Sequence, residues 1–481
     1  WHVAVGDRLI EHGLFETDPY TFTFAGKTWL PHQWLGEGLM SVIHRLAGLD
    51  GLLILTTGLL AAVYTALGVR LLRMGLHISV TAVLVALAVA VSSGHFHIRP
   101  HLGTIVGLLF TMIYLVEVEA KRVPLTRLYW LIGVFWLWAN VHGGALGGLA
   151  TVAFAYSGWL CKYWFFRSGP LENQRGLLHL LGSGVGSALV CLVNPFTYRL
   201  PQTWLEIYRM KSLPSIIKEH APLTLEDWSG LVIILGGLGY VLLLSSVRWR
   251  EGRITWLLPV VWFALACLRV RHAPLFAVVG LIALADFFPH TRLAERLLRQ
   301  KSDLFDPNKA EDTRPQEALL AFAVPCFAVF LLFCLAGGGV RGIAKLDSTL
   351  WPTELLPELQ AHQHDRAGGT RIFNEYAYGG YLIQQTPGYR VFIDDRCELF
   401  GDEFLTQFVL TKAGLAAGVY EHPAEPFAQW QADYKAFDLA LVETGGGFDL
   451  ALARIDAWEI VRGTKTATLY RKKPVPVATS D

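Results

Sequence analysis

The stretch GLLILTTGLLAAVYTALGV, residues 51–69, decides the fold class of this sequence. It contains no charged residue, and an α-helix needs about 20 mostly apolar residues to cross roughly 30 Å of hydrocarbon. Of the 481 residues in the chain, 53% are hydrophobic and only 17% are charged, and the mean hydropathy is +0.39. Such values are typical of polytopic membrane proteins and not of soluble domains.

The sequence contains about ten apolar runs of this kind, several of them short. They lie near Gly51 to Val69, Ile78 to Ser92, Leu102 to Val118, Leu128 to Ala139, Leu146 to Phe166, Leu177 to Val193, Leu231 to Val247, Trp256 to Leu268, Leu275 to Phe288 and Ala318 to Ala336. Alternate connections between the runs are rich in Lys and Arg, which marks cytoplasmic loops. We therefore expect the opening residues and everything after Ala336 on the outer side. That orientation requires one more helix upstream, giving about eleven spans.

The composition changes after Gly337 to that of a small α/β domain. The runs TRIFNEY, YRVFIDDR, FDLALVET and TATLYRK are predicted strands, and Leu355 to His364 is a predicted amphipathic helix. We read FNEYAYGGYLI and VFIDDRCELFG as strand, tight Gly-Gly turn and strand. The expected organisation is a mainly α, transmembrane helical bundle over residues 1–338, with a first extracytoplasmic loop at 1–48, followed by an extracytoplasmic α/β domain over residues 339–481.

Charge and cysteine content exclude several classes of protein. The formal net charge is +1 and no basic run follows the pattern of a phosphate-backbone contact, so nucleic acid is not an expected partner. The six cysteines show no spacing of a zinc site or a disulfide framework.

A pair of carboxylates stands in the opening loop, in the stretch FETDPY that begins at Phe15. Glu16 and Asp18 can project from an extended segment ahead of Pro19, as a general base, as ligands of a divalent cation, or as both. The alternative is that Asp18 starts a turn and Glu16 is solvated. Trp29 and Trp34 are residue types of the membrane interface and are expected to hold the loop at the lipid surface.

Basic side chains gather at the outer ends of several runs, in GHFHIRPHLG, WANVHGG and LRVRHAP. An Arg at the edge of the hydrocarbon tends to face a polar cavity or a phosphate. The alternative is a snorkelling Arg beside interface histidines. The candidates for binding a substrate phosphate are His97, Arg99, His101, His142, Arg269, Arg271 and His272.

The opening loop, WHVAVGDRLIEHGLFETDPYTFTFAGKTWLPHQWLGE, resembles the first extracytoplasmic loop of bacterial GT-C membrane glycosyltransferases, a superfamily that includes O-mannosyltransferases, aminoarabinose transferases and oligosaccharyltransferases. With RPHL, WANVHGG, NPF, RVRHAPLF and the two tail motifs, the resemblance covers nearly the whole chain. It is closest to a bacterial subgroup with a C-terminal extracytoplasmic α/β domain.

The resemblance implies an enzyme of the bacterial inner membrane that uses a polyprenyl-phosphate-linked sugar and an envelope glycan, lipid or protein acceptor. Asp18 takes the position of the acidic loop residue, with Glu16 beside it, and outer Arg residues such as Arg99 and Arg271 stabilise the leaving phosphate. Metal use stays open. The alternative is a non-enzymatic protein of the same architecture that binds a lipid or glycan, or that acts as an envelope scaffold. A transporter is a weaker third reading, because few charges lie at mid-membrane.

Overall fold

The structure, a computed structural model, describes residues 1–248, 252–310, 342, 344–363 and 369–474, and this part of the chain divides into two compact units. The helical unit contains residues 32–204 and the described part of 217–343. The sheet unit contains residues 1–31, 205–216 and the described part of 344–481. The expected domain boundary at residues 338 and 339 lies outside the described residues. Residues 1–31, expected as a loop of the membrane domain, pack with the sheet unit.

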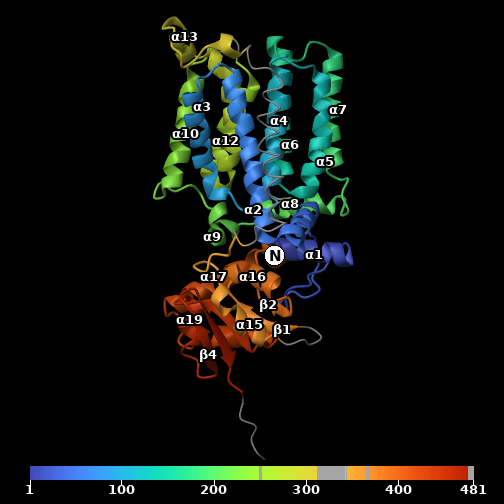
Figure 1. Ribbon diagram of the computed structural model, residues 1–481. Helices are drawn as coiled ribbons and strands as arrows, with labels where there is room; N and C mark the ends of the chain where they lie inside the picture. Colours follow the sequence, from blue (N-terminus) through green and yellow to red (C-terminus); the bar gives the residue numbers. More distant parts are fainter. Residues whose placement is uncertain (249–251, 311–341, 343, 364–368, 475–481) are drawn as a thin grey trace, which may run out of the picture. The chain divides into compact units, whose positions relative to one another are not determined.

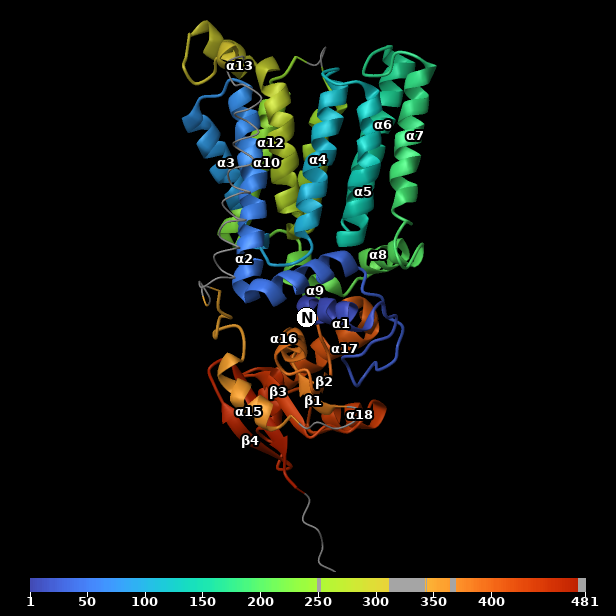
Figure 2. The same ribbon diagram turned by 45° about the vertical axis from the view of Figure 1, so that its right-hand side comes forward.

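The helical unit consists of long helices that run beside one another, as α4, α5, α6 and α7 do in Figures 1 and 2. Its helices are α2 (Trp34–Arg73), α3 (Ile78–Ser92), α4 (Leu102–Glu119), α5 (Trp130–Val141), α6 (Ala145–Phe166), α7 (Gln174–Val190), α10 (Trp228–Ser245), α11 (Leu258–Leu268), α12 (Ala273–Phe287) and α13 (Arg292–Arg299). Every predicted apolar run up to Phe288 overlaps one of them. The last run, Ala318 to Ala336, lies outside the described residues.

Five helices in the described part of the chain are long and apolar enough to cross a membrane. They are Trp34–Arg73, Ile78–His95, Leu102–Glu119, Trp228–Ser245 and Val270–His290, and Ile254–Leu268 is a shorter apolar helix. The helical unit is therefore that of a multi-pass membrane protein, whereas the expected number of about ten spans is not confirmed. The 12 residues of α5, for example, rise only about 18 Å.

The 40-residue helix α2 bends near its first third. Ala47 and Gly48 leave the helical conformation, and Gly48 has a φ of +62°, which a residue without a Cβ adopts at little cost. The apolar run of residues 51–69 lies wholly after this bend, so the spanning part of α2 begins there.

Charged groups at the C-terminal end of α4 form a compact network with its neighbours. The Glu119 carboxylate accepts hydrogen bonds from the backbone N–H groups of Ile254 and Thr255, at 2.7 and 2.8 Å. Asp286 of α12 forms ion pairs with Arg122 at 2.8 Å and Arg253 at 2.5 Å, and its side-chain exposure is 0%. These bonds satisfy the polar groups where three chain segments meet, as an apolar solvent requires.

The sheet unit contains a five-stranded sheet in the order β2-β1-β3-β5-β4. Its strands are β1 (Thr370–Asn374), β2 (Tyr389–Val391), β3 (Leu439–Glu443), β4 (Trp458–Gly463) and β5 (Ala467–Lys472). The pairs β1–β2 and β1–β3 are parallel, and β3–β5 and β4–β5 are antiparallel. Its helices are α1 (His2–His12), α9 (Leu213–Ile216), α15 (Leu356–Ala361), α16 (Tyr376–Gln385), α17 (Cys397–Ala416), α18 (Glu425–Asp433) and α19 (Gly447–Leu452), while α8 (Arg199–Arg209) is divided between the two units.

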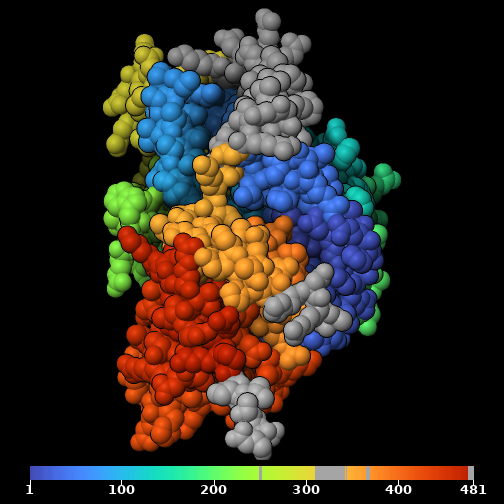
Figure 3. All heavy atoms as spheres, turned by 60° about the horizontal axis from the view of Figure 1, so that its bottom comes forward, coloured from blue at the N-terminus to red at the C-terminus, as the bar shows by residue number. Residues whose placement is uncertain are grey.

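The N-terminal segment extends this sheet beyond β2. Thr21 forms a parallel bridge to Val391, whose N–H donates to the carbonyl of Tyr20 at 3.0 Å, and the N–H of Phe22 donates to the carbonyl of Val391 at 3.1 Å. In Figure 3 the dark blue atoms of the N-terminal residues adjoin the orange atoms of the C-terminal ones. The first and last parts of the chain thus share one hydrogen-bonded layer.

The predicted strands are found in the sheet, with one correction. TRIFNEY, YRVFIDDR, FDLALVET and TATLYRK contain β1, β2, β3 and β5, whereas β4 was not predicted. The predicted Gly-Gly turn is wrong, because YAYGGYLI forms α16. A Cβ at Gly379 would lie 2.1 Å from the carbonyl oxygen of Ile393, so this glycine allows α16 to approach the chain after β2. The helix predicted from Leu355 begins with a 3-10 turn and ends at Ala361, and His364 lies outside the described residues.

The helical unit offers a direct test of its packing at Gly107. A Cβ at this position of α4 would lie 2.3 Å from the ring of Trp138, which is 2% exposed. We expect Gly107→Ala to lower the free energy of unfolding by about 1–3 kcal/mol, because the ring has no room to move away. Gly133→Ala in α5 is the control, since nothing lies within 4 Å of its Cβ position. Equal thermal midpoints of the two variants in detergent would contradict this packing.

Candidate functional site

One end of the helical unit brings together the ends of α3, α5 and α11 and the starts of α4 and α12. The loop before α10 is held to this end by two backbone hydrogen bonds: Val270 N–H donates to Ala221 at 3.1 Å and Leu223 N–H donates to Cys267 at 3.0 Å. These bonds place the 3-10 turn η3 (Lys218–His220) beside η6 (Val270–His272). The side chains of these two turns form the centre of a basic cluster.

Glu219 lies in this cluster as the partner of two basic side chains. Its Oε1 is 3.2 Å from His97 Nε2 and 3.3 Å from Arg99 Nη1. Burial alone would raise the pKa of the Glu219 carboxyl, but the hydrogen bond from His97 and the charge of Arg99 outweigh burial and lower the pKa to about 2. Glu219 is therefore a carboxylate at neutral pH.

Arg271 lies beside His220 within the basic cluster. The Arg271 guanidinium donates a hydrogen bond to His220 Nε2, so the proton of the neutral imidazole sits on Nδ1. His220 is only 6% exposed, and its Nδ1 has no hydrogen-bond partner. Burial and the charges of Arg271 and Arg269 lower the pKa of His220 to about 3. A buried N–H donor next to a guanidinium is thus left without an acceptor.

His101 caps the start of α4 and is held by a neighbouring carbonyl. Its Nε2 donates to the carbonyl oxygen of His95 at 2.9 Å. Burial lowers its pKa to about 4, with the charge of Arg99 acting in the same direction, although the bond to His95 opposes the shift. His101 is neutral at pH 7 and leaves Nδ1 as an acceptor.

His142 is fixed in one tautomer by two hydrogen bonds. Its Nδ1 accepts the backbone N–H of Gly144 at 3.0 Å and lies 2.7 Å from the hydroxyl of Thr104, which also accepts the indole N–H of Trp138. Because a backbone N–H can only donate, Nδ1 carries no proton and Nε2 does. A Cβ at Gly144 would lie 2.0 Å from Thr104 Oγ1, so the glycine is needed for this contact.

The structure separates the predicted site residues into two groups. The basic ones lie in the helical unit, and Arg271 acts electrostatically on His95, His101, His142, His220 and His272. Arg269 belongs to the same cluster through its effect on His220 and Arg271, while His272 Nδ1 donates to Leu265 at 3.1 Å. Asp18, Glu16 and Trp29 belong to the sheet unit.

Asp18 is enclosed within the sheet unit. It is 4% exposed, its Oδ1 lies 2.7 Å from a guanidinium nitrogen of Arg396, and its carboxylate accepts the backbone N–H groups of Tyr20 and Thr21. Asp394 binds the same guanidinium at 2.6 and 2.9 Å. Burial opposes the charge on Arg396, but the two carboxylates outweigh burial and raise its pKa. Asp18 thus starts a turn, as the alternative interpretation had it, and ties the N-terminal segment to the sheet.

The two tryptophans expected at the lipid surface are engaged in hydrogen bonds. Trp29 is 3% exposed, lies 4.5 Å from the Arg396 guanidinium and donates to Glu398 at 2.8 Å, so this residue is a core residue of the sheet unit. Trp34, in the helical unit, is half-buried and donates to Asn140 at 2.9 Å. Glu16 is exposed.

A divalent cation does not fit well at the predicted carboxylate pair. The oxygens of Asp18 already accept backbone and hydroxyl donors and face a guanidinium. In the described part of the chain, no group of three or more His, Cys, Asp or Glu side chains is placed to hold a metal ion.

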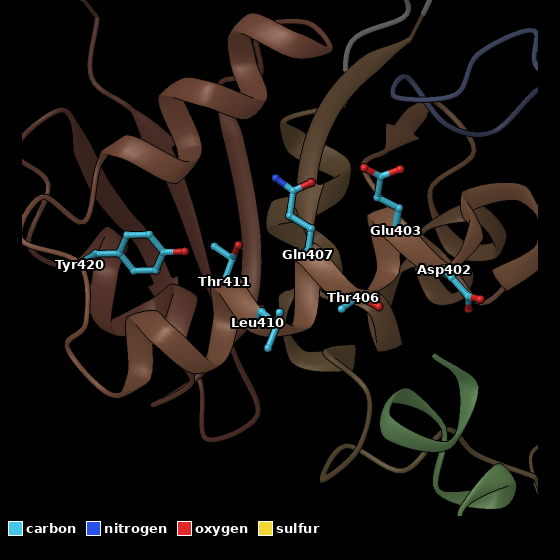
Figure 4. Close-up of a pocket in the computed structure, with 7 residues that line it drawn as sticks. All are labelled: Asp402, Glu403, Thr406, Gln407, Leu410, Thr411 and Tyr420. Carbon is cyan, nitrogen blue, oxygen red and sulfur yellow. The ribbon is translucent and has the colours of Figure 1, made fainter. Parts of the chain in front are cut away.

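A hollow lies along α17 in the sheet unit (Figure 4) and has a volume of about 640 Å³. It is lined by Asp402, Glu403, Thr406, Gln407, Leu410, Thr411 and Tyr420. Asp402 accepts the backbone N–H groups of Lys211 and Ser212, at 3.0 and 2.9 Å. Acidic and amide side chains line this hollow, so it does not suit a phosphate.

Glu219 and His220 were not among the predicted site residues. The sequence shows them only as KEH in the long connection from Asn194 to Trp228, which has no motif around them. The available signal was complementary charge: a Glu in a loop on the same predicted side as Arg99 and Arg271.

No family model and no curated protein matches this sequence. Solved structures do match it: the archaeal oligosaccharyltransferase AglB from Archaeoglobus fulgidus, in complex with an inhibitory peptide and a dolichol-phosphate, aligns with a TM-score of 0.52 at 11% identity, over 100% of this chain and 70% of that one. The Archaeoglobus fulgidus oligosaccharyltransferase tethered with an acceptor peptide containing the NVT sequon aligns with a TM-score of 0.52 at 12% identity, over 98% and 70% of the two chains. The chain has a GT-C-like fold. The resemblance seen in the sequence is thereby confirmed at the level of the fold.

Because Asp18 is enclosed and paired with Arg396, we expect that removing its charge destabilises the sheet unit. Asp18→Asn removes one of the two carboxylates that compensate Arg396, and breaking a buried ion pair costs about 3 kcal/mol or more. We expect faster amide hydrogen exchange in residues 17–29 and in β2. Glu16→Gln, two residues away and exposed, is the control and should exchange as the unmodified chain does. Unchanged exchange in Asp18→Asn would refute the structural role.

The buried neutral histidines predict a loss of stability in acid. The pKa values of His220 and His101 are lowered from 6.5 to about 3 and about 4, so between these values and pH 6.5 the unfolded chain binds protons that the folded chain does not. The contribution of these two neutral histidines to the free energy of unfolding is fully present above pH 6.5 and is lost as the pH falls. From pH 7 to pH 5 we expect each to cost about 1–2 kcal/mol, measured by thermal unfolding in detergent. His101→Gln should reduce this loss, and an unchanged midpoint at pH 5 would contradict the prediction.

Proposed function

We propose that this protein is a membrane glycosyltransferase that transfers a sugar from a polyprenyl-phosphate-linked donor to an envelope glycan, lipid or protein acceptor. The site of transfer is the outer face of a bacterial inner membrane, and the sheet unit is extracytoplasmic. The observation that carries the proposal is the basic cluster around Arg271, located at the ends of apolar helices in a GT-C-like fold.

The chemistry of the cluster fits a phosphate that arrives from the lipid. Arg99, Arg269 and Arg271 provide positive charge, and guanidinium groups bind phosphate oxygens in a bidentate way. The Nδ1–H of His220 and the Nε2–H of His142 are neutral donors whose positions are fixed by their partners. In transfer, such groups would stabilise the negative charge that develops on the leaving phosphate.

Within this proposal the two carboxylates of the opening loop have different roles. Glu16 is exposed and is the proposed acid that orients or deprotonates the acceptor nucleophile. Asp18 is proposed to support Glu16 by fixing the backbone of the loop through Arg396. The oxygens of Asp18 are taken by a guanidinium, a hydroxyl and backbone N–H groups, so the carboxylate pair does not fit a metal ion.

The occupation of Asp18 favours a second candidate function. The oxygens of Asp18 are occupied by a guanidinium and two backbone N–H groups, so they do not face an acceptor hydroxyl. A protein that binds a lipid or glycan headgroup, or that acts as an envelope scaffold, would need the basic cluster and no catalytic acid. Between the two candidates we favour the enzyme, because the basic cluster lies in a fold that is shared with solved oligosaccharyltransferases.

Transfer of radiolabelled sugar from a panel of polyprenyl-phosphate sugars, in membranes that carry the full chain, tests the proposal. We expect Arg271→Gln to lower transfer by about 100-fold or more, as the loss of one charge-stabilising group does in other enzymes. Arg175→Gln, which changes an exposed arginine in the first turn of α7, is the matched control and should retain full activity.

Expression and thermal midpoint are compared for each variant, so that misfolding is separated from loss of function. Transfer that survives in Arg271→Gln would contradict the proposed site. Absence of transfer from every donor, together with anion binding that depends on Arg271, would favour the second candidate.

A further inference from the structure

The basic cluster contains its own anion, Glu219, and the ion pairs of this anion are longer than those of Asp286. Glu219 contacts His97 and Arg99 at 3.2 to 3.4 Å. At the opposite end of α4, Asp286 contacts its arginines at 2.5 and 2.8 Å with a side-chain exposure of 0%. The Glu219 contacts are longer, and they are made in a more open place.

The exposure of the three partners indicates a weak pairing. The side chain of Glu219 is 25% exposed, and those of His97 and Arg99 are 45% and 47% exposed. Ion pairs in such positions contribute about 0–1 kcal/mol, because water competes for both charges. A ligand that offers more negative charge can therefore replace the carboxylate.

Glu219 does not accept a hydrogen bond from every donor of the cluster. The Nδ1–H of His220 is buried without an acceptor, although His220 is the next residue along the chain. A phosphate or diphosphate carries several acceptor oxygens, so it can accept from Arg99 and from His220 together, which one carboxylate does not do here.

We propose that Glu219 is a built-in competitor of the substrate phosphate: its carboxylate occupies Arg99 and His97 in the unliganded protein, and a phosphate or diphosphate group displaces it. This inference rests on the proposed function, since it assigns the phosphate to the same cluster. Glu219 thus sets the selectivity of the site, because an anion must outcompete a carboxylate to bind. Ligands with little charge, such as free sugars, do not displace it.

The test is calorimetric binding of inorganic pyrophosphate to the purified full chain in detergent. Glu219→Gln removes the competing charge and keeps the size of the side chain, so we expect about fivefold tighter binding, since the ion pair that phosphate must break is worth up to about 1 kcal/mol. Arg99→Gln should weaken binding by about tenfold. The control is Glu172→Gln, which removes an acid that is 68% exposed and pairs with Lys121, and it should bind as the unmodified chain does.

A second set of titrations uses nanodiscs with and without polyprenyl phosphate. If the lipid is the source of the phosphate, Glu219→Gln should reduce pyrophosphate binding in the loaded nanodiscs, because lipid then fills the site more completely. If free pyrophosphate alone is bound, the two kinds of nanodisc give the same affinity. Either result agrees with displacement and identifies the source of the anion.

Equal or weaker pyrophosphate binding by Glu219→Gln in detergent, with binding that still requires Arg271, would overturn the displacement and leave the anion site of the proposed function in place. No binding by any form would overturn both. The thermal midpoint without ligand shows whether Glu219→Gln is folded. If it is not, Glu219→Asp, with a carboxylate one methylene further from Arg99, should tighten binding in the same direction by a smaller factor.

Discussion

An apolar solvent allows charged groups only where they are paired or where a helix ends, and this constraint arranges the whole helical unit. Helix α4 illustrates it, because its interior is uncharged and both of its ends lie in polar clusters. At its C-terminal end, Glu119 caps the backbone of Ile254 and Thr255. At its N-terminal end, His101 is held by a carbonyl and faces Arg99. The same physical requirement thus gives a closed network at one end and an excess of donors at the other.

The polar clusters at the two ends of α4 have different roles. Asp286, whose side chain is fully buried, forms short ion pairs with Arg122 and Arg253, and these pairs tie α12 to the neighbouring segments. The Arg271 end holds longer contacts and a buried donor without an acceptor. Unsatisfied buried donors cost stability, and a bound ligand that accepts hydrogen bonds from them offsets this cost.

The sequence predicted the elements well because their signals are local. Apolar runs predicted the helices, and β-branched runs predicted four of the strands, since both depend on neighbouring residues. Arg99 and Arg271 were predicted to lie on the same side of the membrane, because alternating spans bring every second loop to one side. The partners of Asp18 and Glu219 could not be predicted, because Arg396 and His97 are distant in sequence and no motif links them. The Gly-Gly pair of α16 was wrongly predicted to be a turn. The sequence alone does not distinguish a glycine that allows close packing of a helix from a glycine that allows a turn.

The shared layer of the sheet unit has a consequence for how the chain is made. Thr23 donates a hydrogen bond to the carbonyl of Phe392, across a separation of 369 residues. At about 5–20 residues per second, the ribosome needs roughly 20 to 70 seconds to supply this partner after the N-terminal segment has emerged. During that interval the membrane helices are already being inserted, while residues 17–29 wait with Asp18 uncompensated and Trp29 exposed. Synthesis of the last residues, and not of the first, therefore completes this part of the fold.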